Sequence, residues 1–188
     1  LVRDGRIGDP VFFRGHFSFQ ATPDSTRLVP EWGGGALYDL GCYVVAWSRY
    51  FFQEEPEAAH CRLIRKDGTG VDLRYAGTLL FPGGGTAHLT GAIDMPYGCG
   101  YAIKGTQGEL EVRQFADAQT ITVRVTVNGE SQDYSSDRVT PYARQAQRFA
   151  QLALAGDRAT DGPDEIMAQV RAMDALFASD AAGARIRL

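Results

Sequence analysis

Residues 73–93 have the sequence LRYAGTLLFPGGGTAHLTGAI, and this stretch predicts two neighbouring strands of one sheet. Apolar or aromatic side chains alternate with polar or small ones on both sides of a central turn: Leu73, Tyr75, Leu79, Phe81, Ala87, Leu89 and Ile93. The Pro82–Gly85 segment between the two runs is typical of a hairpin connection. Because a tight turn reverses the chain direction, the stretch predicts an antiparallel pair.

Two further segments show the same alternation. The first is residues 11–19, with Val11, Phe13, Phe17 and Phe19 on one face and Arg14, His16 and Ser18 on the other. The second is residues 121–127, which end at Asn128–Gly129, a dipeptide that favours a hairpin because both turn positions need positive φ. We detect no pattern for the helical crossovers that a parallel sheet requires, so we expect antiparallel pairing.

Three segments have helical periodicity instead. The first extends from about Gly35 to Phe52, with Leu37, Leu40, Val44, Trp47 and Phe51 at helical spacing. The second begins at Thr140–Pro141, a hydroxyl N-cap followed by proline at the first helical position, and ends near Gly156.

The third helix begins at Gly162–Pro163, with acidic residues in its first turn, where the helix dipole favours them. We expect it to turn Ile166, Val170, Met173 and Phe177 inward. The order of the segments predicts an α+β domain: one large, mainly antiparallel open sheet with helices on one face. Apolar residues such as Phe12 and Leu80 lie on the other face; they are either scattered surface residues or part of a face that docks another subunit, and we expect the latter.

Composition limits the classes of function. The chain has 188 residues, 44% of them hydrophobic and 22% charged, which predicts one folded domain and excludes a disordered chain. A formal net charge of -4 argues against a nucleic-acid partner. The sequence has no apolar run long enough for a membrane span, and its three scattered cysteines favour a reducing compartment. We therefore expect a soluble, cytoplasmic protein cut from a longer chain.

Common cofactor and metal motifs are absent from the sequence. It contains no G-x-G-x-x-G fingerprint, no P-loop and no G-x-S-x-G elbow. Its cysteines and histidines do not have the spacing of a local metal site. We expect no metal and no nucleotide-binding loop within these residues.

The densest group of candidate functional residues is the segment 32–43, WGGGALYDLGCY. Three glycines at a helix start let the backbone approach a bulky neighbour closely, and the free amides there suit a polar or anionic ligand. Asp39 and Tyr43 are four residues apart, so they share one face of the helix. Such a pair could bind a substrate alcohol, but the spacing alone favours an ordinary amphipathic helix, because such pairs are common on helix surfaces.

A resemblance to a known family bears on this choice. Segment 33–43 with Arg27 upstream, the GRIGD motif at 5–9, the IKGTQGEL motif at 103–110 and the helix at 142–156 occur in the order found in the Gfo/Idh/MocA oxidoreductases. The chain is similar over its whole length to the C-terminal substrate and oligomerisation domain of that family. That domain resembles the C-terminal domain of glyceraldehyde-3-phosphate dehydrogenase.

The resemblance implies roles for several residues. Asp39 and Tyr43 match the catalytic acid and the His or Tyr that follows it, with tyrosine as in the glucose–fructose, dihydrodiol and xylose dehydrogenases. It also implies substrate contacts for Trp32, Gly34, Gly35 and, less directly, Arg27. Family members bind NAD or NADP in an N-terminal Rossmann domain, which is missing here together with its catalytic lysine.

The resemblance therefore predicts the substrate-binding domain of an NAD(P)-dependent dehydrogenase of sugars or related polyol and carbonyl compounds. Such a domain would bind no cofactor alone, would be inactive alone and would form homo-oligomers through its open sheet face. The alternative is a non-catalytic module that mediates dimerisation or binds a sugar. A free-standing enzyme of another class is a third possibility, but no nucleophile–base pair supports it.

Overall fold

The computed structural model describes residues 1–114, 120–137, 141–157 and 162–188. The strands among these residues are β1 (Pro10–Gln20), β2 (Ala58–Arg65), β3 (Asp72–Leu80), β4 (Thr86–Ala92), β5 (Asp94–Gly105), β6 (Gly108–Gln114), β7 (Thr120–Val127), β8 (Glu130–Asp137) and β9 (Ile186–Arg187). The α-helices are α1 (Cys42–Phe52), α2 (Pro141–Ala155) and α3 (Pro163–Ala182). Short helical turns η1 (Thr26–Leu28), η2 (Pro30–Trp32) and η3 (Leu37–Gly41) precede α1.

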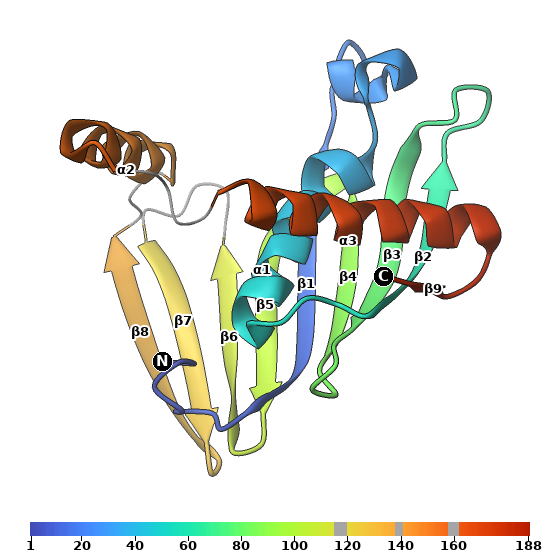
Figure 1. Ribbon diagram of the computed structural model, residues 1–188. Helices are drawn as coiled ribbons and strands as arrows, with labels where there is room; N and C mark the ends of the chain where they lie inside the picture. The colour runs from blue at the N-terminus through green and yellow to red at the C-terminus, as the bar shows by residue number, and fades with distance from the viewer. Residues whose placement is uncertain (115–119, 138–140, 158–161) are drawn as a thin grey trace.

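The described strands form one sheet in the order β8-β7-β6-β5-β1-β4-β3-β2-β9 (Figure 1). The expected hairpin at Pro82–Gly85 joins β3 to β4. Asn128 and Gly129 join β7 to β8 with φ values of 52° and 82°, as that turn requires. The predicted α+β class with a large, mainly antiparallel open sheet is confirmed.

One pair of strands departs from the expected pairing. β1 and β4 are parallel, with Phe13 opposite Ala87 and Phe17 opposite Gly91. The chain between them passes through α1 and then through the β2–β3 hairpin, so the crossover includes a helix after all. The expectation that the chain contains no helical crossover was wrong, because local alternation does not reveal which non-consecutive strands become neighbours.

The hydrophobic core lies between the sheet and two of the helices, α1 and α3, which lie on the same face (Figure 1). The buried stripe of the first helical segment includes Leu37, Leu40 and Val44, as the periodicity predicts. Arg49 links the two helices, because its guanidinium donates to Glu55 and to Glu165 at 2.7 Å each. The predicted arrangement of helices on one face thus holds for α1 and α3.

The third helix begins at Pro163 as predicted, but its buried face differs from the expected one. Ile166 and Val170 are exposed, whereas Met173 and Leu176 are buried. The first turns of α3 contact the polar Arg49 side chain through Glu165, and only the later turns pack on β2 and β3. Periodicity located the apolar stripe, but it could not tell which turns of the helix reach the sheet.

Helix α2 has the expected extent, and its predicted N-cap, Thr140, lies outside the described residues. Figure 1 shows α2 beyond the ends of β7 and β8, away from the core. Phe149 is exposed and Leu154 is 89% exposed, so this helix leaves apolar side chains uncovered in the described structure. None of the described helices has the length and hydropathy of a membrane-spanning segment.

We predict that Leu176→Ala lowers the free energy of unfolding by about 2–5 kcal/mol, the usual cost of a large-to-small change in a core. Leu176 is 0% exposed and packs over Gly77 of β3. Urea unfolding monitored by circular dichroism measures the change. The matched control is Leu154→Ala on α2, which should leave stability within about 0.5 kcal/mol of the wild type. Equal losses in both variants would contradict the position assigned to α3.

Candidate functional site

The glycine-rich segment forms a tight turn between η2 and η3. Gly33 has φ 74° and Gly35 has φ 138°, conformations that favour glycine. A Cβ on Gly34 would overlap the carbonyl oxygens of Arg27 and Val29, and one on Gly35 would overlap the Asp72 carboxylate. Gly34 and Gly35 therefore allow close contact with the protein's own backbone and with Asp72, rather than with a ligand. Gly33 faces open space.

Asp72, at the start of β3, holds the first turn of the helical segment formed by η3 and α1, which carries Asp39 and Tyr43 and is called the site helix below. Its Oδ2 atom accepts a hydrogen bond from the Leu37 amide at 2.7 Å, and the carboxylate is buried. Burial raises the pKa of this carboxyl group, although the hydrogen bonds from the Leu37 and Ala36 amides oppose that effect. The Leu37 and Ala36 amides at this helix start already donate to the Asp72 carboxylate. They are therefore not available to an anionic ligand, which the sequence had suggested.

Sequence reasoning did not identify Asp72. Strict alternation along β3 would place it on the same face as Arg74, which is exposed and paired with Asp94. The register with β2 shifts between Ile64 and Arg65, and such irregularities change the direction of a side chain. The irregular register is visible only when both strands are paired in three dimensions.

Four of the predicted site residues lie around one small hollow together with Asp39. Arg27, Trp32, Gly34 and Gly35 line a space of about 190 Å³. Arg27 Nε donates to Asp39 Oδ2 at 2.6 Å, so the arginine binds the acid directly. The pair fixes the Asp39 carboxylate at the rim of the hollow, where both side chains retain access to solvent.

Tyr43 lies one turn beyond Asp39, on α1, and outside the lining of that hollow. Its ring packs on Phe17 of β1, with ring centroids 5.5 Å apart, and on Trp47 of its own helix, at 6.4 Å. Burial raises the pKa of the Tyr43 phenol, and Tyr142, Cys42 and Asp39 raise it further. At neutral pH this phenol is protonated, so it can donate a proton but needs further help to accept one.

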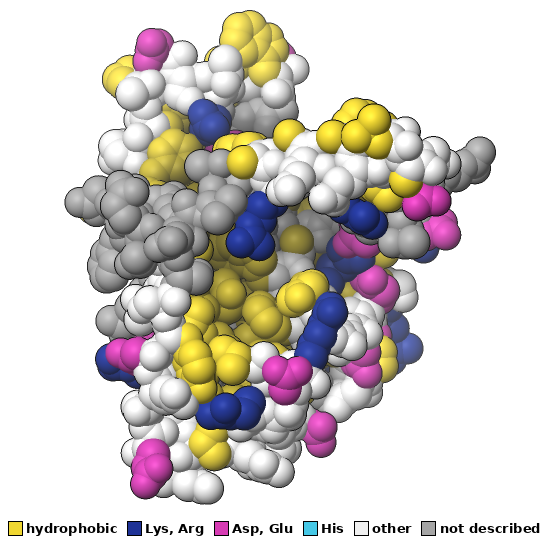
Figure 2. Space-filling view, turned by 90° about the vertical axis from the view of Figure 1, so that its left-hand side faces the viewer, with side chains coloured by type: hydrophobic (Ala, Val, Ile, Leu, Met, Phe, Trp, Pro, Cys, Tyr) yellow, Lys and Arg dark blue, Asp and Glu magenta, His cyan; other side chains and the backbone are white. Residues whose placement is uncertain are grey.

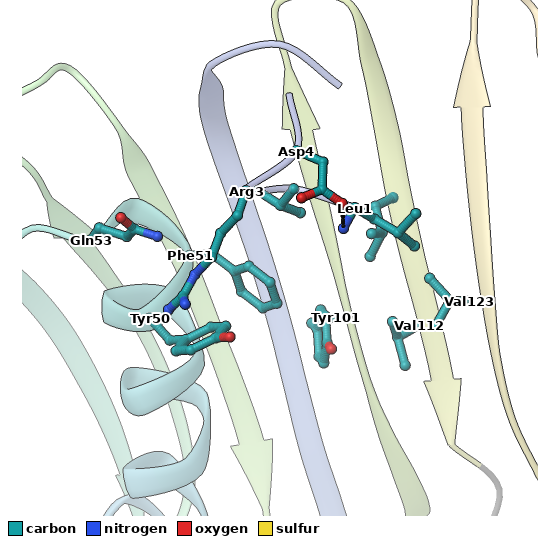
Figure 3. A pocket seen from close by; sticks show the side chains of 11 residues that line it. Leu1, Arg3, Asp4, Tyr50, Phe51, Gln53, Tyr101, Val112 and Val123 are labelled. Atoms are coloured by element: carbon teal, nitrogen blue, oxygen red, sulfur yellow. Dashed lines mark hydrogen bonds and ion pairs between the residues drawn. The ribbon is translucent and has the colours of Figure 1, made fainter. Parts of the chain in front are cut away.

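A second hollow of about 330 Å³ lies between α1, the N-terminal residues and β5–β7. Figure 3 shows the Tyr50, Phe51 and Tyr101 rings facing the Val112 and Val123 side chains beneath the first residues of the chain. Figure 2, seen from the β8 side, shows hydrophobic side chains gathered in a depression. Ring contacts from Tyr43 through Trp47 to Tyr101 connect this apolar region with the site.

The polar hollow lies at the start of the helical segment that carries Asp39 and Tyr43, and the apolar hollow lies at its end. In the described part of the chain, no cluster of three or more metal-ligating side chains is present. The Arg27–Asp39 pair at the polar hollow is suited to a ligand with hydroxyl groups, and the aromatic ring of Tyr43 offers an apolar contact beyond it.

Comparison with known proteins places the chain in a family. Residues 1–111 match the model of the GFO/IDH/MocA C-terminal domain, which covers more than half of the chain. The protein therefore belongs to the GFO/IDH/MocA family, as the ordered motifs predicted.

Individual relatives agree with this assignment. The chain is 28% identical over 187 residues to D-xylose 1-dehydrogenase (NADP(+)) 2 of Haloferax volcanii, covering 97% of the chain and 57% of that protein. An aldose-aldose oxidoreductase from Caulobacter crescentus, solved with glycerol, superposes with a TM-score of 0.88 at 25% identity over 100% of the chain and 58% of that protein. The 3-ketoreductase KijD10 from Actinomadura kijaniata, solved with NADP and TDP-benzene, shares the fold with a TM-score of 0.86 at 22% identity, over 95% of the chain and 56% of that protein. The chain thus spans little more than half the length of these relatives.

We predict that Asp72→Asn changes the pH dependence of stability. The pKa of Asp72 in the folded state is raised above its ordinary value of 3.8, so protonation of Asp72 stabilises the folded state. This stabilisation is complete below about pH 3.8, and it is lost as the pH rises through the folded-state pKa. The wild type should therefore gain stability relative to the variant between pH 7 and pH 4, measured by urea unfolding. Asp67→Asn, in an exposed turn, is the control and should show no such gain. A constant stability difference between wild type and Asp72→Asn would disprove this linkage.

Proposed function

We propose that this chain is the substrate-binding domain of an NAD(P)-dependent oxidoreductase that acts on a sugar or a related polyol or carbonyl compound. The observation that carries the proposal is the helix from η3 to α1, which holds Asp39 and Tyr43 beside the hollow lined by Arg27 and Trp32. Family membership and the names of the relatives support it.

We assign cofactor binding to an N-terminal Rossmann domain, in the part of the relatives that lies outside the match. The bound nicotinamide would supply hydride chemistry, and this chain would hold the substrate and move the proton. In this arrangement, the isolated chain is inactive and binds neither NAD nor NADP.

Within the chain, Tyr43 exchanges the proton of the reacting hydroxyl group. Asp39, held by Arg27, accepts a hydrogen bond from a neighbouring substrate hydroxyl rather than taking up the proton. Trp32 and the Gly34–Gly35 turn form the wall of the pocket. Because the Tyr43 pKa is raised, a nearby positive charge, such as the family lysine of the N-terminal domain, would have to assist proton removal.

We also propose that the full-length protein forms homo-oligomers through the sheet face opposite α1 and α3. Phe12 of β1 is 51% exposed on that face, among polar neighbours such as Arg14 and His16. We assign the contact to this face because α1 and α3 leave it uncovered, and the Phe12 ring is an exposed aromatic group near the middle of the sheet. Cys42 and Cys61 form no disulfide in the described structure, which supports a reducing, cytoplasmic location.

We predict that Tyr43→Phe in the full-length enzyme lowers kcat about 10²–10⁴-fold, the usual contribution of a general acid–base group. Steady-state NADP reduction with D-xylose and other aldoses measures the effect. The matched control is Tyr50→Phe on the same helix, whose ring contacts Arg3 and Phe51 and which should keep wild-type turnover. Unchanged turnover in Tyr43→Phe would favour the non-catalytic module instead.

We further predict that Phe12→Glu dissociates the oligomer, because it places a charge in the middle of the contact surface. Light scattering coupled to size-exclusion chromatography should give an oligomeric mass for the wild type and a monomeric mass for the variant. Ile64→Glu, a charge added to the exposed side of β2 near the edge of the sheet, serves as the control and should have the smaller effect. A variant with the wild-type mass would rule out this face as the interface.

A further inference from the structure

The first residues of the chain form a hydrogen-bonded turn with the geometry of a helix end. The Gly5 amide donates to the Val2 carbonyl oxygen at 2.9 Å, and the Arg6 amide donates to the Leu1 carbonyl oxygen at 3.2 Å. Gly5 has φ 72°, in the left-handed region. Two such bonds around a left-handed glycine are the Schellman motif, which ends an α-helix at the residue before the glycine. The motif gives residues 1–4 the position of the last turn of a helix.

The charges and amides of this turn agree with a helix end. A helix carries partial negative charge at its C-terminus, where cationic side chains are stabilising. Arg3 lies in the turn, and Arg6 lies just after it. Among the described residues, none accepts a hydrogen bond from the amides of Val2, Arg3 or Asp4. In an α-helix, these amides donate to carbonyl oxygens four residues earlier, which would all precede Leu1.

The same turn lies at the edge of the apolar hollow of about 330 Å³ between α1 and β5–β7. Leu1 lines this hollow on the side of Val112 and Val123 (Figure 3). The Arg3 guanidinium lies over the Tyr50 ring of α1, 4.8 Å from the ring centroid. An aliphatic side chain and a stacked cation thus hold the turn against the two walls of the hollow.

The turn covers only part of the hollow. Tyr50 is 56% exposed and Leu1 is 38% exposed, and Phe51, Tyr101 and Val123 are only partly buried. Figure 2 shows the hydrophobic side chains that remain visible in this depression. Because one face of a helix repeats every three or four residues, side chains three and four positions before Leu1 would extend the same apolar face over the hollow.

We propose that the apolar hollow between α1 and β5–β7 is the docking site of an α-helix of this protein that precedes Leu1 and ends at Asp4. The chain spans little more than half the length of its relatives, and the matching family model describes a C-terminal domain, so a preceding segment is expected. A helix at this place goes beyond the proposed function, and it is expected in an enzyme and in a non-catalytic module alike.

The docked helix connects the preceding part of the protein to the site helix. Tyr50 and Phe51, which line the hollow, belong to the last turns of α1, and Tyr43 belongs to its first turn. A helix packed against these two rings fixes the orientation of α1 relative to the segment before Leu1. The apolar side chains of the hollow are then buried on both sides, as in other grooves that bind an amphipathic helix.

The first test measures hydrogen exchange of the Val2, Arg3 and Asp4 amides by mass spectrometry, in the full-length protein and in this chain. Helical hydrogen bonds to the preceding residues should slow their exchange at least about 100-fold in the full-length protein. The Asp67 amide, in an exposed turn, is the control and should exchange equally in both. Circular dichroism checks that this chain is folded. Equal exchange of the three amides in both proteins overturns the inference.

The second test uses the full-length protein alone and measures whether the hollow is covered. The thiol of Val123→Cys, on the wall of the hollow, should react with a thiol reagent at least about 100-fold more slowly than that of Asp67→Cys. The parent protein gives the background from the natural cysteines. Equal reaction rates in the two variants overturn the docking site.

A third variant identifies the segment that covers the hollow. Val2→Pro removes a helical donor and places a proline ring against the preceding turn, so it should speed the reaction of Val123→Cys about tenfold and leave Asp67→Cys unchanged. A Val123→Cys thiol that stays protected in Val2→Pro means that another segment covers the hollow, which overturns the proposed occupant. None of these measurements uses turnover, so an enzyme that is inactive with every aldose overturns the proposed function and leaves this result intact.

Discussion

The site depends on one buried contact, the hydrogen bond between the Asp72 carboxylate and the amide of Leu37. This 2.7 Å contact joins the start of β3 to the first turn of the helix that carries Asp39 and Tyr43. It also explains why position 35 is glycine, since any side chain there would overlap the carboxylate. The position of the site helix therefore depends on the register of a hairpin far away in the sequence.

The functional groups form two sets on the same helix. The polar set at the glycine turn includes the Arg27–Asp39 pair, and the aromatic set around Tyr43 includes Phe17 and Trp47. Under the proposed function, a sugar would place its hydroxyl groups against the polar set and an apolar ring face against the aromatic set.

Much of the fold could be predicted from local patterns, because alternation and turn residues act over a few positions. Residues 73–93 and Asn128–Gly129 indicated their hairpins correctly, and Pro163 marked the start of α3. The parallel β1–β4 pair and the direction of the Asp72 side chain depend on strand neighbours and register, which no local pattern contains. Arg27, Trp32 and Asp39, which lie close together in the sequence, line one hollow in the structure, whereas the packing of Tyr43 on Phe17 joins segments that no motif links.

The central claim is that this domain holds the substrate at the helix that begins beneath the glycine turn. The most direct measurement is a crystal structure of the full-length protein with NADP and a bound aldose. Our account predicts a sugar hydroxyl within hydrogen-bond distance of the Tyr43 oxygen and another at the Asp39 carboxylate. A sugar bound away from this helix, with Tyr43 and Asp39 making no contact to it, would contradict the account.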